Sequence, residues 1–142
     1  MATAYFNDLI NIINGTGSTV SNSSIAKVGD FAFGSCKNLT SISLPNVVEV
    51  GDNSFYYCTR LKTISLPKLE KIGGRSFYFC TALTTIDLPN VISIGNGVFS
   101  GCKNLKEIHF AIDNKEIIKK LDGYSSNFGA VDTAIMYFDL QV

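Results

Sequence analysis

Ser65, Asp87 and His109 follow one another along the sequence at a constant interval of 22 positions. A serine, a carboxylate and a histidine are the side chains of a hydrolytic triad, in which the histidine accepts the serine proton. If each residue occupies the same position on successive strands about 4.8 Å apart, Asp87 lies in the middle, and about 10 Å separates Ser65 from His109. This order disfavours a triad and favours a simple Asp87–His109 pair. We therefore predict that the protein is not an enzyme.

Four cysteines stand at the same interval: Cys36, Cys58, Cys80 and Cys102. This spacing differs from the C-x-x-C pairs of zinc sites, and no second type of ligand stands at a suitable spacing, so no metal is expected. Disulfides between neighbouring coils are conceivable from the strand spacing, although parallel side chains give them poor geometry. We favour a column of small buried side chains. No cofactor is expected.

The constant interval marks an internal repeat that covers residues 27–110. The four units begin at Lys27, Glu49, Lys71 and Ser93. One unit cannot bury its own apolar face, so neighbouring units must stack on it. The L-x-x-I-x-L segment of each unit ends in alternating apolar and polar residues, which predicts a short strand. A proline ends this strand in three units, since proline donates no ladder hydrogen bond: Pro45, Pro67 and Pro89.

Two further columns of the repeat predict the parts of the coil outside the strand. The glycine column is expected to mark a turn that needs a permissive backbone. The F-x-x-C stretch is too short for a regular helix, so a single helical or 3₁₀ turn is predicted there. Each coil is thus expected to combine one strand with short turns.

The segments on either side of the repeats are expected to cap the stack. Residues 1–26 show apolar residues at helical spacing as far as Gly15, followed by a degenerate repeat. Residues 111–142 contain a predicted capped helix that ends at Gly123 and then a final strand in TAIMYFDL.

Composition excludes several classes of partner. The 142 residues suit one domain, and twelve basic residues balance twelve acidic ones. This balance argues against a nucleic-acid partner and against an electrostatic membrane anchor. No apolar run approaches the roughly 18 residues of a membrane span, so no membrane insertion is expected. No secretory signal peptide is visible at the N-terminus.

At the repeat columns the sequence resembles the BspA-like leucine-rich repeats, whose units read roughly I-G-x-x-A/S-F-x-x-C-x-x-L-x-x-I-x-L-P. Residues 28–45, 50–67 and 72–89 match this pattern closely, and residues 94–110 match until Ala111 replaces the proline. The resemblance implies an α/β repeat fold: a right-handed leucine-rich-repeat solenoid with a parallel sheet on one face and short helical or 3₁₀ turns opposite. Apolar residues replace the asparagine of the commonest leucine-rich pattern: Val47, Leu69 and Val91.

The resemblance also implies a role outside the cell. The family occurs on bacterial surfaces, in some protozoa and in bacteriophage proteins, with roles in adhesion and recognition. We expect a non-catalytic module, extracellular, on a cell surface or on a virion, that binds a protein or glycan ligand. The alternative is a structural subunit of a phage tail or host-recognition assembly, whose main partner is another copy of the chain.

The residues between the inward-facing leucine and isoleucine of each strand are expected to face outward in two columns. The first column is Ser41, Thr63, Thr85 and Glu107. The second column is Ser43, Ser65, Asp87 and His109. This strand face is the expected ligand-binding surface, and a solvated sheet without a partner is the alternative.

Aromatic residues gather in the two middle repeats: Tyr56, Tyr57, Tyr78 and Phe79. The outer repeats have glycine or serine at the same positions. The aromatic side chains form either a contact patch or packing between coils.

Overall fold

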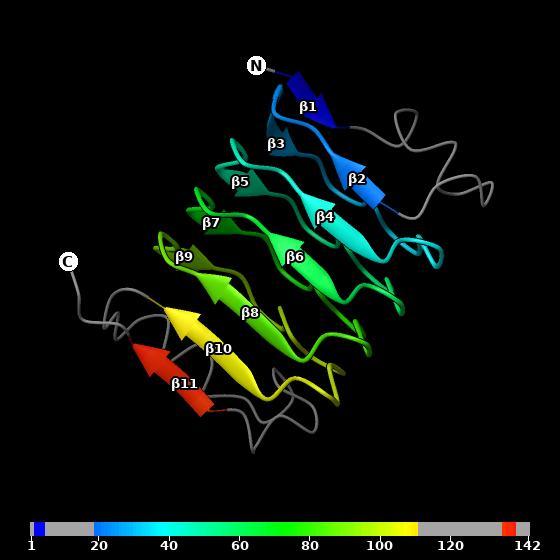
Figure 1. Cartoon of the computed structure of the whole chain (residues 1–142), viewed down its shortest axis with the longest axis vertical. Helices are drawn as coiled ribbons and strands as arrows, with labels where there is room; N and C mark the ends of the chain where they lie inside the picture. The colour runs from blue at the N-terminus through cyan, green and yellow to red at the C-terminus, as the bar shows by residue number, and fades with distance from the viewer. Residues whose placement is uncertain (1, 5–18, 111–134, 139–142) are drawn as a thin grey trace.

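The computed structural model describes residues 2–4, 19–110 and 135–138, which form a solenoid with two rows of parallel strands (Figure 1). The first row consists of β1 (Ala2–Ala4), β3 (Ile25–Val28), β5 (Glu49–Val50), β7 (Lys71–Ile72) and β9 (Ser93–Ile94). The second row consists of β2 (Thr19–Ser21), β4 (Ser41–Ser43), β6 (Thr63–Ser65), β8 (Thr85–Leu88), β10 (Glu107–Phe110) and β11 (Ile135–Phe138). In this row β2-β4-β6 and β8-β10-β11 are hydrogen-bonded sheets, and β6 contacts β8.

The register of the strands confirms the repeat. Ser41 pairs with Thr63, and Thr85 pairs with Glu107, so each partner is the equivalent residue of the next repeat. Strands β4, β6 and β8 all end before the prolines, as predicted. Because parallel strands in this register place equivalent side chains above one another, every column of the sequence becomes a column in space.

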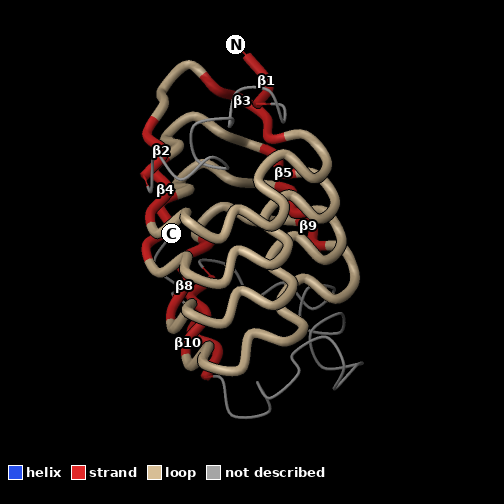
Figure 2. The backbone as a smooth tube through the Cα atoms, turned by 90° about the vertical axis from the view of Figure 1, so that its right-hand side faces the viewer, coloured by secondary structure: helices blue, strands red, loops and turns tan. Residues whose placement is uncertain are grey.

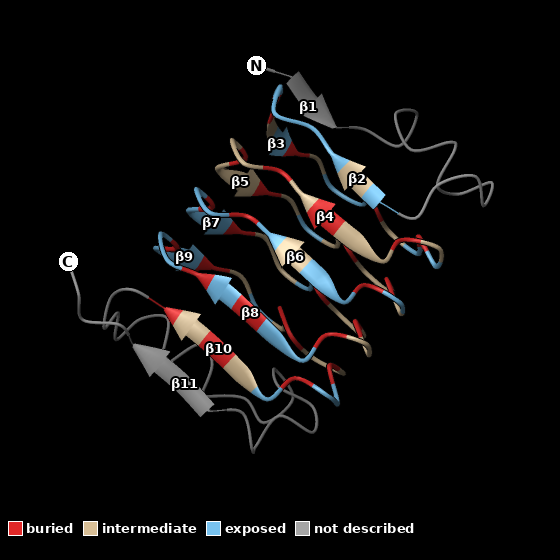
Figure 3. Ribbon diagram, viewed as in Figure 1, coloured by how far each residue is buried: buried red, intermediate tan, exposed pale blue. Residues whose placement is uncertain are grey.

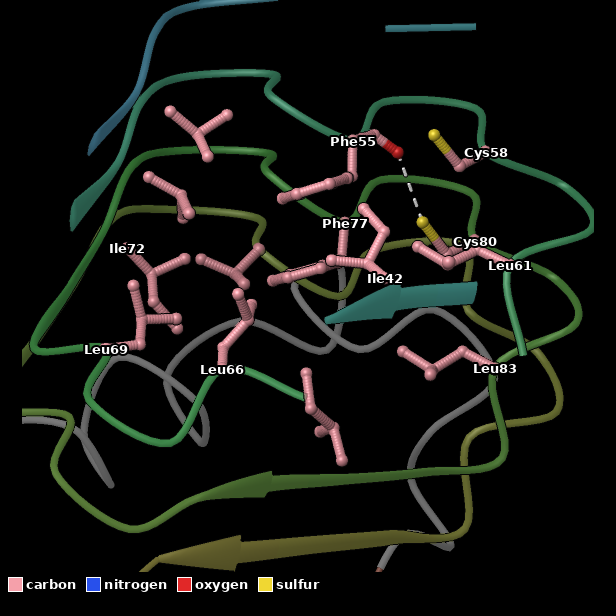
Figure 4. Packing of buried hydrophobic residues seen from close by; sticks show 14 of the residues in the cluster. Ile42, Phe55, Cys58, Leu61, Leu66, Leu69, Ile72, Phe77, Cys80 and Leu83 are labelled. Carbon is pink, nitrogen blue, oxygen red and sulfur yellow. Dashed lines mark hydrogen bonds between the residues drawn. The ribbon is translucent and has the colours of Figure 1, made fainter. Parts of the chain in front are cut away.

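The interior is built from these columns. The leucines at 39, 61, 83 and 105 are all buried, together with the four cysteines. Phe33, Phe55, Phe77 and Phe99 form a continuous stack with ring centroids 5.0, 5.2 and 5.8 Å apart. Figure 4 shows Phe55 and Phe77 above one another, with the cysteine and leucine columns beside them. Each coil therefore covers the apolar side of the next, as a repeat protein requires.

The third side of the coil consists of turns, and the prediction of a single sheet with helical or 3₁₀ turns opposite was wrong in two respects. The residues just before the glycine column form the first row of strands, and the described residues contain no helix (Figure 2). The hydrogen bonds explain why. On this turn side, the N–H groups of Phe31 and Phe33 donate to the carbonyls of Asp52 and Ser54 in the next coil. A helix needs consecutive N–H groups directed along its own axis, and here alternate groups leave the coil.

The turn side also contains two columns of residues with left-handed backbone conformation. The first is Phe31, Asn53, Arg75 and Gly97, and the second is Ser35, Tyr57, Phe79 and Gly101, with φ between 53° and 78°. Glycine adopts this conformation freely, whereas other residues lose roughly 1–2 kcal/mol in it. Only the fourth coil uses glycine in both columns, whereas Phe31, Tyr57 and Phe79 of the earlier coils are held in a strained conformation.

The glycine column of the repeat has a different role from the predicted one. Gly51, Gly73 and Gly95 are absent from the left-handed residues, so they do not serve a special turn conformation. A Cβ atom built at Gly73 lies only 2.5 Å from the backbone N of Asp52 and from the carbonyl C of Gly51. These glycines are needed because the neighbouring coil passes too close for any side chain.

The predicted caps lie largely outside the described residues. Ala2–Ala4 form β1, and the rest of the predicted N-terminal helix is not among the described residues, nor is the predicted helix before Gly123. The predicted final strand is present as β11, which pairs with β10.

Two buried serines in one column provide a test of the interior. Ser54 and Ser76 are fully buried. The Ser76 hydroxyl contacts the carbonyl oxygens of Gly51 and Gly73, whereas Ser54 Oγ has no hydrogen-bond partner among the described residues. We expect Ser76→Ala to lower the free energy of unfolding by about 1 kcal/mol, and Ser54→Ala to leave it unchanged or raise it. Urea denaturation measures both variants, and equal losses would contradict the difference in hydrogen bonding.

Candidate ligand-binding face

The second row of strands presents the polar surface of the solenoid. Along each strand the middle residue points inward and its neighbours point outward, which Figure 3 shows as alternating burial along β4 and β8. All eight predicted site residues lie on this strand face. Thr63, Ser65, Thr85 and Asp87 are exposed, and Ser41, Ser43, Glu107 and His109 are half-buried.

The rows extend one strand further than the sequence analysis assigned. Thr19 pairs with Ser41, and Ser21 pairs with Ser43, so β2 adds a further hydroxyl to each row. The sequence contained this information, because Thr19 and Ser21 precede Ser41 and Ser43 by one full repeat interval. The rows thus run from hydroxyl groups on β2, β4 and β6 to charged groups on β8 and β10.

The predicted pair of Asp87 and His109 is confirmed. His109 Nδ1 lies 2.7 Å from Asp87 Oδ1 on the neighbouring strand. A second contact was not predicted: His109 Nε2 lies 3.2 Å from Glu107 Oε2 on the same strand. Residues two apart in a strand share a face, so the sequence placed Glu107 on the correct side but could not give its rotamer.

This arrangement disfavours hydrolytic chemistry. Both ring nitrogens of His109 face carboxylates, so neither is directed toward a serine hydroxyl whose proton it would have to accept. Ser65 lies on β6, so the strand that carries Asp87, β8, separates it from His109 on β10. The face instead offers hydroxyls, which donate and accept hydrogen bonds, and carboxylates, which accept them.

The cysteine column is buried, as predicted. The thiols of Cys58, Cys80 and Cys102 donate hydrogen bonds to the carbonyl oxygens of Phe33, Phe55 and Phe77, at 3.0, 3.2 and 2.9 Å. Burial raises the pKa of Cys36 to about 11 and raises the pKa of Cys58 and Cys80 as well. A reactive cysteine needs a stable thiolate, so these thiols are structural.

The aromatic residues lie on the turn side, away from the strand face. Tyr56 stacks on Tyr78 with ring centroids 5.3 Å apart, and Tyr57 stacks on Phe79 at 5.0 Å. All four rings are half-buried. The four rings therefore pack between coils. That their exposed edges also form a contact patch for a partner stays a prediction.

None of the described residues belongs to a helix long and apolar enough to cross a membrane.

The comparison with protein families shows which repeat family the chain belongs to. Residues 8–127 match the BspA type leucine rich repeat region in six copies. The chain belongs to the BspA-type leucine-rich repeat family. The six copies exceed the four near-identical units found by inspection, and the match extends into both flanking segments. Among curated proteins, none matches the sequence.

Solved structures of bacterial leucine-rich repeat proteins share the fold. A leucine-rich repeat protein from Bacteroides ovatus superimposes with a TM-score of 0.64 and 29% identity, over 84% of this chain and 35% of its own. A leucine rich cell surface protein from Faecalibacterium prausnitzii gives 0.68 and 22%, over 86% of this chain and 32% of its own. The pneumococcal vaccine antigen PcpA gives 0.62 and 23%, over 66% and 24%. This BspA-type chain spans about a third of the first two proteins.

Proposed function

We propose that this BspA-type chain is a non-catalytic recognition module that acts outside the cell and binds a protein or glycan through the strand face. The observation that carries the proposal is the pair of outward rows, one residue from each strand in each row, which run from the hydroxyls of β2 to the Asp87–His109–Glu107 cluster. The F. prausnitzii relative is described as a cell surface protein, which supports the same location here.

The chemistry of the face indicates a polar ligand. The large exposed apolar residues in the described part of the chain are Phe31 and Ile92, and neither lies on the strand face. The serine and threonine side chains are short, so little conformational freedom is lost when a ligand orders them. A ligand with many hydroxyl or amide groups therefore fits this face best, and a hydrophobic ligand fits it poorly.

The face is also rigid, which favours binding. Parallel ladders tie its strands together within β2-β4-β6 and within β8-β10-β11, and both sheets rest on a core in which Ile42, Ile86 and Ile108 are buried. A surface that does not rearrange loses less entropy on association.

A pair of matched serine substitutions tests the proposal. Ser65→Lys places a bulky charge in the middle of the strand face, and Ser93→Lys makes the same change at an exposed serine on β9, in the other row of strands. We expect Ser65→Lys to weaken binding roughly tenfold or more, because a desolvated lysine and a steric block each oppose contact. Ser93→Lys is expected to bind like the unmodified chain.

The assay measures retention of the labelled chain on immobilised oligosaccharides and on fixed epithelial cells. Circular dichroism checks that both variants keep the fold. If both lysine variants bind as the unmodified chain does, the strand face is not the recognition surface.

The alternative function is a structural subunit of a phage tail or host-recognition assembly. It requires contact between copies of the chain. The aromatic residues of the turn side give a specific reason to expect such a contact.

A further inference from the structure

We propose that two copies of the chain associate through the turn side, with the aromatic cluster of one copy packed against that of the other. The aromatic cluster comprises Phe31, Tyr56, Tyr57, Tyr78 and Phe79. This proposal concerns a different surface from the strand face and does not rest on its function.

The turn itself does not require these aromatic residues. The fourth coil makes the same turn with Gly97, Ser100 and Gly101, in the columns that hold large side chains in earlier coils. Phe31, Tyr57 and Phe79 adopt the left-handed conformation that glycine adopts without strain. Ser35, Asn53 and Arg75 adopt the same conformation, so the geometry of the turn does not select aromatic rings at these positions.

The cluster has the composition and rigidity of an interface centre. Phe31 is 56% exposed, and its ring meets that of Tyr56 edge to face. The Arg75 guanidinium lies over the Tyr78 ring, 5.6 Å from its centroid. Tyrosine and arginine are enriched at interface hot spots, and stacked rings lose little freedom on association.

The stacking also limits what can bind. The paired rings are 5.0–5.3 Å apart with planes 4–5° from parallel, so the faces between them are covered by each other. A flat ligand that stacks on an open ring face finds little room. The partner must meet ring edges and tyrosine hydroxyls, which another aromatic cluster does through edge-to-face contacts.

Charge indicates that the partner is a second copy. Exposed acidic residues, Asp30 and Asp52, precede the cluster in their coils, and exposed basic residues, Lys37 and Arg60, follow it. A two-fold axis parallel to the solenoid axis places the acidic border of one copy opposite the basic border of the other, in both directions. The balanced net charge of the chain adds no long-range repulsion between copies.

Sedimentation equilibrium of the full chain over a range of concentrations tests this proposal. We expect a reversible monomer–dimer equilibrium. The double variant Tyr78→Ser, Phe79→Gly gives the third coil the residues of the fourth, Ser100 and Gly101, and is expected to weaken the dimer at least about tenfold. Circular dichroism shows whether this variant keeps the fold.

A charge substitution keeps the test decisive without touching the packed rings. Arg60→Glu sets two acidic borders against each other and is expected to weaken the dimer several-fold, whereas Lys71→Glu on β7 makes the same charge change outside the turn side and leaves the dimer intact. A chain that stays monomeric at every concentration overturns the proposal. A dimer that Arg60→Glu and Lys71→Glu affect equally overturns it too.

Discussion

Replacement of Phe77 by alanine is expected to lower the free energy of unfolding by about 4 kcal/mol. Phe77 is fully buried and lies in the middle of the stacked column, between Phe55 at 5.2 Å and Phe99 at 5.8 Å. Its backbone is tied to the fourth coil: its N–H donates to the carbonyl of Val98, and its carbonyl accepts the thiol of Cys102. These bonds oppose closure of the coils around the missing ring, so a cavity is expected to remain.

Phe79→Ala is the matched control, because Phe79 lies two residues along the same coil and its ring is half-exposed. Guanidinium denaturation followed by circular dichroism should show a much smaller loss for Phe79→Ala. In a repeat protein each coil is stabilised by its neighbours, so the loss at Phe77 is expected to affect the contacts on both sides of the third coil. Similar losses for the two variants would show that the column is not the centre of the core.

The core and the strand face could be predicted because both depend only on the repeat interval and on the alternation of residues along each strand. The constant repeat interval fixes which side chains lie above one another, and alternation within a strand fixes which face inward. The interval alone therefore places Phe77 and Leu83 in interior columns, and it places Ser65 and Asp87 in one outward row.

Neither the first row of strands nor the turn side could be predicted in the same way. Strands such as Glu49–Val50 contain two residues, which is too short for any alternation to be visible. The left-handed conformation at Tyr57 and Phe79 contradicts local preference and is imposed by hydrogen bonds from the coil to its neighbour. In the sequence, the left-handed conformation is indicated only by Gly97 and Gly101 of the fourth coil. The coils that carry the aromatic residues have no glycine in these two columns.

The cluster around His109 shows a similar limit. The strand spacing predicted the contact with Asp87 because the two residues share a row. The contact with Glu107 depends on how two side chains on one strand turn toward each other, and several rotamers were compatible with the sequence. The repeat therefore determines the position of a residue on the surface, while the local charge arrangement depends on side-chain rotamers that the repeat does not fix.

Gly73→Ala is expected to lower the free energy of unfolding by about 3 kcal/mol. The new Cβ would lie 2.5 Å from the backbone N of Asp52 and the carbonyl C of Gly51, and neither backbone atom can move without separating two coils. The N–H of Gly73 also donates to the carbonyl of Val50 at 2.8 Å, so a shift of the coil lengthens this hydrogen bond. The methyl group thus opposes the stacking on which the whole repeat depends.

Gly74→Ala separates this contact from the general effect of replacing glycine. The two glycines are adjacent, and neither has a left-handed conformation, so the unfolded chain loses similar freedom in both variants. At Gly74 the nearest atom to a new Cβ is the carbonyl oxygen of Asn96 at 3.3 Å, which needs to move only slightly. We expect a change within about 1 kcal/mol for Gly74→Ala by urea denaturation. If the two variants lose the same stability, close approach between coils is not what requires glycine in this column.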